Sequence, residues 1–227
     1  GAVRVPDYAR RLRGGGIDAG AEPKLERRAP SLALVDGANA LGPVVGLRAL
    51  EAGLEMARET GIAYVGCRAS NHFGAIAPYG RIACEAGFVM LAGTNASATM
   101  PPWGGKALRL GNNPLCIAAP GALGAHFILD IAMSVAARGK IRAAATAGRS
   151  IPQDWATDKD GRPTTDPAAA LAGYLLPFGG HKGSGLSMAL DLLAGVLAGG
   201  RFLTDVVTWV GNATEPQGTG HFFVLVD

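Results

Sequence analysis

Residues 178–200 have the sequence FGGHKGSGLSMALDLLAGVLAGG, a glycine-rich loop that leads into an apolar segment of helical length. The loop resembles a phosphate-binding turn, because its glycines expose backbone N–H groups, Lys182 adds a positive charge and a helix N-terminus follows. It does not match GxxxxGK[ST], since Gly179 and Gly180 lie too close to Lys182 and the next residue is Gly183. It does not match GxGxxG either. The pattern therefore excludes a P-loop and the Rossmann fingerprint.

Outward from this segment, the apolar pattern predicts alternating helices and strands. Apolar positions at helical spacing, closed by glycine, predict helices at residues 5–12, 43–60 and 74–87. Short aliphatic runs bounded by Gly, Pro or Asn predict strands at 31–37, 62–68, 88–95, 114–120, 126–134 and 221–227. Residues 17–30 and 149–167 are expected to be irregular, and the second segment is long enough to be functional or to wrap a neighbour.

Composition limits the classes of function. The chain has 227 residues, a formal net charge of +3 and 17% charged residues, with no dense basic run and few aromatics, so we expect no nucleic-acid partner. The apolar segment 185–200 is too short to span a bilayer and carries Asp191, which favours a buried helix over membrane insertion. The three cysteines lie in apolar stretches without CxxC spacing and predict reduced, buried thiols in the cytoplasm.

His72 is the first candidate for chemistry. It lies in the turn SNHFG, residues 70–74, between an expected strand and an expected helix. A histidine held in such a turn suits general acid–base catalysis near neutral pH, whereas the alternative is a cap of the following helix. His126 and His221 each open an expected strand and favour buried structural roles. No pair of metal-ligating residue types stands at ligand spacing, so we expect no metal.

Asp130 is the second candidate, at the end of the apolar strand in FILDIAMSVAARGK, residues 127–140. A carboxylate at a strand end can accept hydrogen bonds from ribose hydroxyls, while nearby backbone N–H groups face phosphates. A helix N-cap is the competing interpretation. The turn TNAS, residues 94–97, also follows an expected strand, where ligands of α/β proteins commonly dock. An acyl-transfer role for Cys116 or Ser97 lacks a partnered base.

Six motifs in this order resemble the type-2 malate/L-lactate dehydrogenase family over essentially the whole chain. They are SNHFG (70–74), TNASATMPPWGG (94–105), NNPLCIAAP (112–120), LDIAMSVAARGKI (129–141), DGRPTTDPAAAL (160–171) and GGHKGSGLSMALDLLAGVLAGG (179–200). The same family includes sulfolactate, ureidoglycolate and 2,3-diketogulonate dehydrogenases and a cyclic-imine reductase.

The resemblance implies an α/β (α+β) fold with a large, mostly antiparallel sheet flanked by helices. This cofactor domain is not of the Rossmann type and stands beside a smaller helical domain in a homodimer. We accordingly assign residues 1–60 to a helical N-terminal part and residues 61–227 to the cofactor-binding domain. Of the family's Ser-His-Gly motif only Gly1 is present, and the segment that follows the GHFF strand is absent. We therefore expect residues to be missing at both ends.

The resemblance also implies a site. His72 matches the catalytic or substrate-binding histidine, and Arg4 and Tyr8 match residues that help to hold the substrate. The positions that match cofactor-binding segments are Asn95, Ala96, Ser97, Asp130, Ile131, Ala132, Met133, Ser134, His181, Lys182 and Gly183. The cofactor is NAD or NADP, and the sequence does not decide between them.

The function implied is a dehydrogenase that interconverts a small, malate- or lactate-like 2-hydroxy acid and its 2-oxo acid by hydride transfer. Its partners would be that substrate and a second copy of the chain. The alternative is a non-catalytic dimeric binding protein that kept the fold.

Overall fold

The computed structural model describes residues 4–227, so Gly1 lies outside the described residues. A seven-stranded sheet organises the chain in the order β1-β2-β3-β9-β4-β5-β6. Every neighbouring pair is antiparallel except β2 and β3, which are parallel. The strands are β1 Lys24–Ala29, β2 Leu32–Asp36, β3 Ile62–Ser70, β4 Val89–Thr94, β5 Leu115–Ala119, β6 Phe127–Ile131 and β9 Thr219–Val226. The fold is thus mixed α/β with a mostly antiparallel sheet, as expected.

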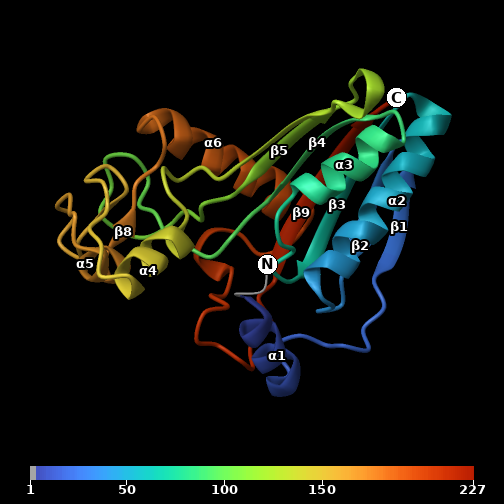
Figure 1. Ribbon diagram of the computed structural model, residues 1–227. Helices are drawn as coiled ribbons and strands as arrows, with labels where there is room; N and C mark the ends of the chain where they lie inside the picture. Colours follow the sequence, from blue (N-terminus) through green and yellow to red (C-terminus); the bar gives the residue numbers. More distant parts are fainter. Residues whose placement is uncertain (1–3) are drawn as a thin grey trace.

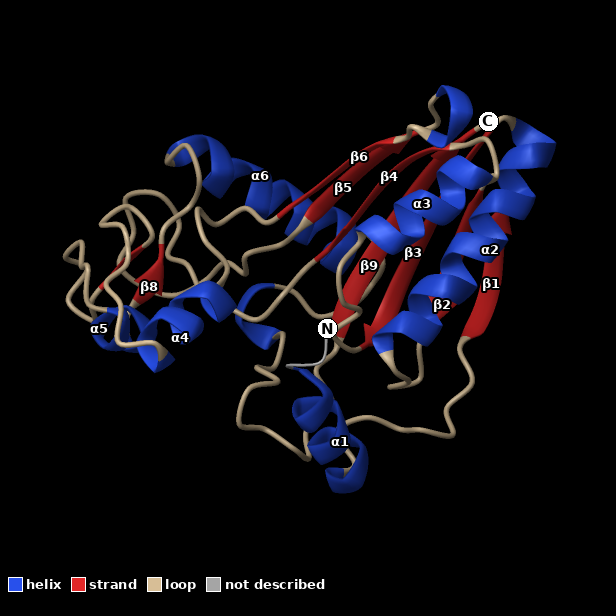
Figure 2. Cartoon of the chain, in the orientation of Figure 1, coloured by secondary structure: helices blue, strands red, loops and turns tan. Residues whose placement is uncertain are grey.

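Helices cover both faces of this sheet, as Figures 1 and 2 show. Helices α2 and α3 pack on one face and bury a core that includes Val35, Leu50, Val65 and Phe223. Helix α6 and the π-helical turn η3 pack on the other face, over Phe222. The helices are α1 Val5–Gly14, α2 Gly42–Thr60, α3 Ala77–Glu85, α4 Arg138–Thr146, α5 Pro167–Ala172 and α6 His181–Asp191, with short turns η2 Ala122–Gly124, η3 Leu192–Val196 and η4 Leu203–Asp205.

Residues 134–180 form a separate group at one end of the sheet, where α4 and α5 pack together beside the two-stranded sheet of β7, Ala156–Thr157, and β8, Tyr174–Leu175 (Figure 2). The segment 149–167, predicted to be irregular, contains β7. The helices predicted at 5–12, 43–60 and 74–87 are confirmed as α1, α2 and α3, and the six predicted strands are confirmed as β2, β3, β4, β5, β6 and β9. The apolar segment 185–200 is helical as expected, in α6 and η3, but the prediction that this helix is buried is wrong, because only one of its faces packs on the sheet. The exposed apolar side chains are Leu186, Met188, Leu192, Val196 and Leu197.

The first 60 residues include more sheet than the sequence indicated. The segment 17–30 was expected to be irregular, but it contains β1, which pairs with β2 at the edge of the sheet. Charged side chains dominate the β1 sequence KLERRA, a composition that protects an exposed edge from further pairing and hides the strand from a search for apolar alternation. Residues 24–60 therefore supply two strands and α2 to the layers built by residues 61–227.

The last strand, β9, enters the middle of the sheet between β3 and β4. Its residues are nearly all buried, because helices lie on both of its faces. A Cβ placed on Gly220 would lie 1.8 Å from the carbonyl oxygen of Ala194, so only glycine lets η3 approach this strand. The central position of β9 brings the loop that precedes it next to the loops that follow β3 and β4.

Candidate active site

One cavity of about 810 Å³ opens where these loops meet. Its wall comes from the segments after β3, β4 and β6, the approach to β5, the first turns of α4 and the loop before β9. The lining residues used below are Arg4, His72, Asn95, Ala96, Ser97, Thr99, Asp130, Ala132, Ala137, Arg138, Gly139, Arg142, Trp209, Gln217 and Thr219. The volume lies in the range of natural small-molecule sites.

His72 lies against an aromatic and cationic cluster at this cavity. The Trp209 ring stacks on the imidazole with ring centres 4.3 Å apart and planes inclined by 14°. The Arg4 guanidinium carbon lies 4.7 Å from the centre of the Trp209 ring. Arg4 also pairs with Asp7 at 3.5 Å. The residue that precedes α1 therefore lies close to the histidine, and the Trp209 indole contacts both side chains.

Tyr8 fixes the edge of the imidazole. Its hydroxyl oxygen lies 2.6 Å from His72 Nδ1 and 3.2 Å from the His72 carbonyl oxygen. If the hydroxyl donates to the carbonyl, Nδ1–H donates to the tyrosine oxygen, and the lone pair of the neutral ring is then on Nε2. This tautomer suits a proton acceptor.

Burial and charge keep His72 neutral. Desolvation is the larger cause, the nearby Arg4 charge adds to it, and together they lower the pKa of His72 to about 4. The backbone is held as well, since His72 N–H donates to Gln217 Oε1 at 2.8 Å. The side chain of Asn71, the preceding residue, donates to Asn39 and Ala40 oxygens. The histidine is thus a fixed and unprotonated base.

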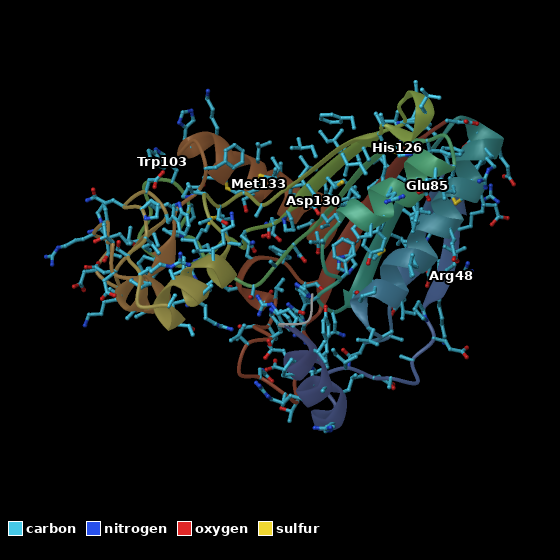
Figure 3. All side chains as sticks on the ribbon, viewed as in Figure 1. Arg48, Glu85, Trp103, His126, Asp130 and Met133 are labelled. Atoms are coloured by element: carbon cyan, nitrogen blue, oxygen red, sulfur yellow. The ribbon has the colours of Figure 1, made fainter. Side chains whose placement is uncertain are left out.

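Asp130 lies between the sheet and α3, as Figure 3 shows. Its Oδ2 accepts hydrogen bonds from the N–H groups of Ile76 and Ala77 at 2.7 and 2.9 Å. The carboxylate therefore caps α3. The helix-cap interpretation holds, but the capped helix precedes Asp130 in the chain and is reached through the fold. The other carboxylate oxygen, Oδ1, makes no hydrogen bond with the described residues. The Asp130 side chain lines the cavity.

The rest of the 130–134 segment is divided between the cavity and the core. Ala132 lines the cavity. Ile131 packs on a core cluster, Met133 is fully buried within it, and the Ser134 hydroxyl donates to the Ala136 carbonyl. Ile131, Met133 and Ser134 therefore do not line the cavity. They position Asp130 and Ala132, which do.

Asn95, Ala96 and Ser97 all line the cavity, but their polar groups differ in availability. The buried Asn95 amide bonds to Asp191, Arg201 and Gly220. Ala96 N–H donates to Asn113 Oδ1 at 2.8 Å. The Ser97 hydroxyl, in contrast, makes no hydrogen bond with the described residues.

The glycine loop lies beside the cavity rather than in its wall. His181 and Lys182 begin α6 and are exposed, and neither is a lining residue of the cavity. Gly183 is buried, and a Cβ built on it would lie 3.2 Å from the Met133 carbonyl oxygen. The loop is thus packed on the Asp130 segment through its backbone, while the side chains of His181 and Lys182 lie outside the cavity wall.

Several residues of the cavity were missed by the sequence analysis. Trp209, Gln217 and Thr219 belong to segments without an assigned motif role, whereas Thr99 and Arg138 lie in quoted motifs but were given no function of their own. The buried hydroxyls of Thr99 and Thr219 find no hydrogen-bond partner among the described residues. Unsatisfied polar groups on a cavity wall indicate a ligand that satisfies them. Their positions in the sequence give no such signal.

Of the remaining candidates, His126 is half-buried rather than buried, and its Nδ1 accepts a hydrogen bond from the Gly121 N–H at 3.2 Å. His221 is completely buried, with Thr94 Oγ1 2.7 Å from Nδ1 and Ser70 Oγ 2.8 Å from Nε2, which confirms a satisfied core histidine. The cysteines are free and buried as expected, and burial raises the pKa of Cys116 to about 12, so its thiol is unreactive. Among residues 4–227, no three His, Cys, Asp or Glu side chains are grouped to hold a metal, and no helix could cross a bilayer.

A neutral, oriented histidine beside an arginine, in a cavity with unsatisfied hydroxyls, has the character of an enzyme active site. The model of the malate/L-lactate dehydrogenase family matches residues 1–227, and the chain belongs to that family.

Individual relatives agree in sequence and in structure. The chain is 40% identical to the L-sulfolactate dehydrogenase of Methanothermobacter thermautotrophicus, with 100% of this chain and 66% of that protein covered. It is 38% identical to the (2R)-3-sulfolactate dehydrogenase (NADP(+)) of Chromohalobacter salexigens, covering 100% and 68%. The solved sulfolactate dehydrogenase of Methanocaldococcus jannaschii superposes with a TM-score of 0.90 at 38% identity, covering 100% and 65%. The chain thus spans about two thirds of the length of these relatives.

Proposed function

We propose that this protein is an NAD- or NADP-dependent dehydrogenase that interconverts a small 2-hydroxy acid and its 2-oxo acid. The observation that carries the proposal is the position of His72 at the wall of a large cavity beside Arg4, as a neutral base that stacks on Trp209 and hydrogen-bonds to Tyr8. Family membership supports it, because the relatives named above are dehydrogenases of hydroxy acids.

The cavity fits a nicotinamide dinucleotide in its chemistry. Thr99 and Thr219 offer unsatisfied hydroxyls, Asp130 offers a free carboxylate oxygen, and Ser97 offers a hydroxyl. These groups suit the ribose hydroxyls and the amide of such a cofactor. When bound, the nicotinamide supplies the hydride acceptor or donor. This binding mode would use no Rossmann unit, and the α4–α5 group would correspond to part of the smaller helical domain.

The residues of this chain would divide the remaining work. Arg4 would pair with the substrate carboxylate through two parallel hydrogen bonds. His72 would take the hydroxyl proton as hydride leaves C2, and Tyr8 would keep the ring in the accepting tautomer. In reduction, protonated His72 would return the proton and stabilise the developing alkoxide. Because the positive charge of Arg4 lowers the His72 pKa, a bound carboxylate that neutralises this charge would raise it.

The proposal also includes a location in the cytoplasm. Three unpaired, buried cysteines are typical of the reducing cytoplasm. A homodimer and the absence of nucleic-acid and membrane partners stay part of the proposal.

The test is an assay of 2-oxo acid reduction by the purified protein. Pyruvate, oxaloacetate, sulfopyruvate and diketogulonate are each mixed with NADH or NADPH, and the loss of reduced-nicotinamide absorbance is followed. We expect turnover with at least one pair. Cofactor binding without turnover of any oxo acid would favour the non-catalytic binding protein, and failure to bind either cofactor would overturn the proposal.

A further inference from the structure

Arg138 and Arg142 lie one helical turn apart at the start of α4, and both line the cavity. Side chains four residues apart are neighbours on a helix, so the two guanidinium groups share one side of α4. Arg138 is half-buried and donates one hydrogen bond to the Leu171 carbonyl oxygen. Arg142 is exposed, and its side chain makes no hydrogen bond with the described residues. Burial, and then the charge of Arg142, lower the pKa of Arg138.

Neither arginine has an acidic partner within residues 4–227. Arg4 at the same cavity is paired with Asp7, and Asp130, the carboxylate on the wall, is bound to the start of α3. Two like charges four residues apart destabilise a helix. Two neighbouring arginines without acidic partners are therefore unfavourable unless an anion binds them. The arrangement therefore has the features of an anion subsite whose counter-ion is a ligand.

The end of α4 adds to this field. Ala137 and Gly139 also line the cavity, and no side chain caps the helix N-terminus. Its free N–H groups and the positive end of the helix dipole therefore lie at the same part of the wall. Two guanidinium groups with an uncapped helix start form a donor set for a phosphate, which arginine binds with paired hydrogen bonds.

We propose that Arg138 and Arg142 hold a phosphate group of the dinucleotide, an inference that rests on the proposed function. The phosphate is either the 2′-phosphate of the adenosine ribose or the pyrophosphate. The first would make this pair a determinant of cofactor choice, since only NADP carries that group.

The experiment is a titration of the purified protein with NADH and with NADPH, followed by nicotinamide fluorescence. Arg142→Ala is the main variant, because the wild-type side chain makes no interaction whose loss would unfold the protein. Arg142→Glu places a negative charge at the same position. Arg149→Ala is the matched control, since Arg149 is exposed, lies outside the cavity wall and has no side-chain partner within residues 4–227.

We expect Arg142→Ala to raise the dissociation constant of at least one cofactor by about ten- to a hundredfold, the range for a charge-assisted hydrogen bond, and Arg142→Glu to raise it further. Weakened NADPH binding alone assigns the 2′-phosphate, and equal weakening of both assigns the pyrophosphate. Unchanged constants for both cofactors, or an equal effect of Arg149→Ala, would overturn the inference. If the wild type binds neither cofactor, the proposed function itself fails.

Discussion

At the scale of single residues, two histidines connect the site to the stability of the protein. Burial lowers the pKa of His221 to about 3, and burial with the Arg4 charge lowers that of His72 to about 4. An unfolded histidine takes up its proton near pH 6.5. Both imidazoles therefore stay neutral in the folded chain at a pH where the unfolded chain is protonated.

The sign of the pH dependence follows from these shifts. Between about pH 6.5 and 4 the unfolded state binds more protons than the folded state, so this contribution to stability is complete above pH 6.5 and is lost as the pH falls. We predict that the free energy of unfolding in urea falls steadily between pH 7 and pH 5. A stability that stays level or rises over that interval would contradict the burial of two neutral imidazoles.

The sequence predicted which residue types form the site better than it predicted how those residues are arranged. The turn SNHFG marked His72, and its place on the cavity wall agrees with that hypothesis. The stacking of Trp209 on His72 could not be predicted, because the two residues are 137 positions apart (209 minus 72) and meet only through the fold. Lys182 shows the opposite case. Its glycine-rich surroundings indicated a cofactor contact, but its side chain is exposed beside the cavity.

At the scale of elements, Asp130 joins β6 to α3. Replacing it by alanine leaves the N–H groups of Ile76 and Ala77 without their acceptor and removes a negative charge from a helix N-terminus. We predict that Asp130→Ala lowers the free energy of unfolding by about 1–3 kcal/mol, as measured by urea denaturation.

Asp166→Ala provides a matched control for this prediction. Asp166 caps α5 through the N–H groups of Ala168 and Ala169, but in an exposed position. Because water replaces a lost bond more readily there, its loss should cost less, about 1 kcal/mol. An Asp130→Ala protein as stable as the wild type would show that the carboxylate does not hold α3.

Elements with a strong apolar period were predicted, and those without one were not. Helix α2 has apolar positions at regular spacing and ends at Gly61, whose φ of 78° is the left-handed value that glycine favours. Helix α4 was missed, because within RGKIRAAAT only Ile141 and Ala144 are buried. The order of the strands was beyond the sequence pattern, since an apolar strand such as β9 pairs equally well with several partners.

At the scale of the whole molecule, the sheet gathers one end of five strands around a single cavity. The insertion of β9 between β3 and β4 places the Gln217–Thr219 turn beside His72. Arg4 immediately precedes α1, and the arginine pair comes from the start of α4. The central claim is that this cavity binds a nicotinamide dinucleotide and that His72 carries the proton of the reaction.

The most direct test is to compare the wild type with His72→Asn in two measurements on the same preparations, cofactor affinity by fluorescence titration and turnover of the best 2-oxo acid. If His72 carries the proton as proposed, the cofactor dissociation constant is unchanged in the variant and turnover is lower by about two to four powers of ten. Equal turnover in the two proteins would contradict it.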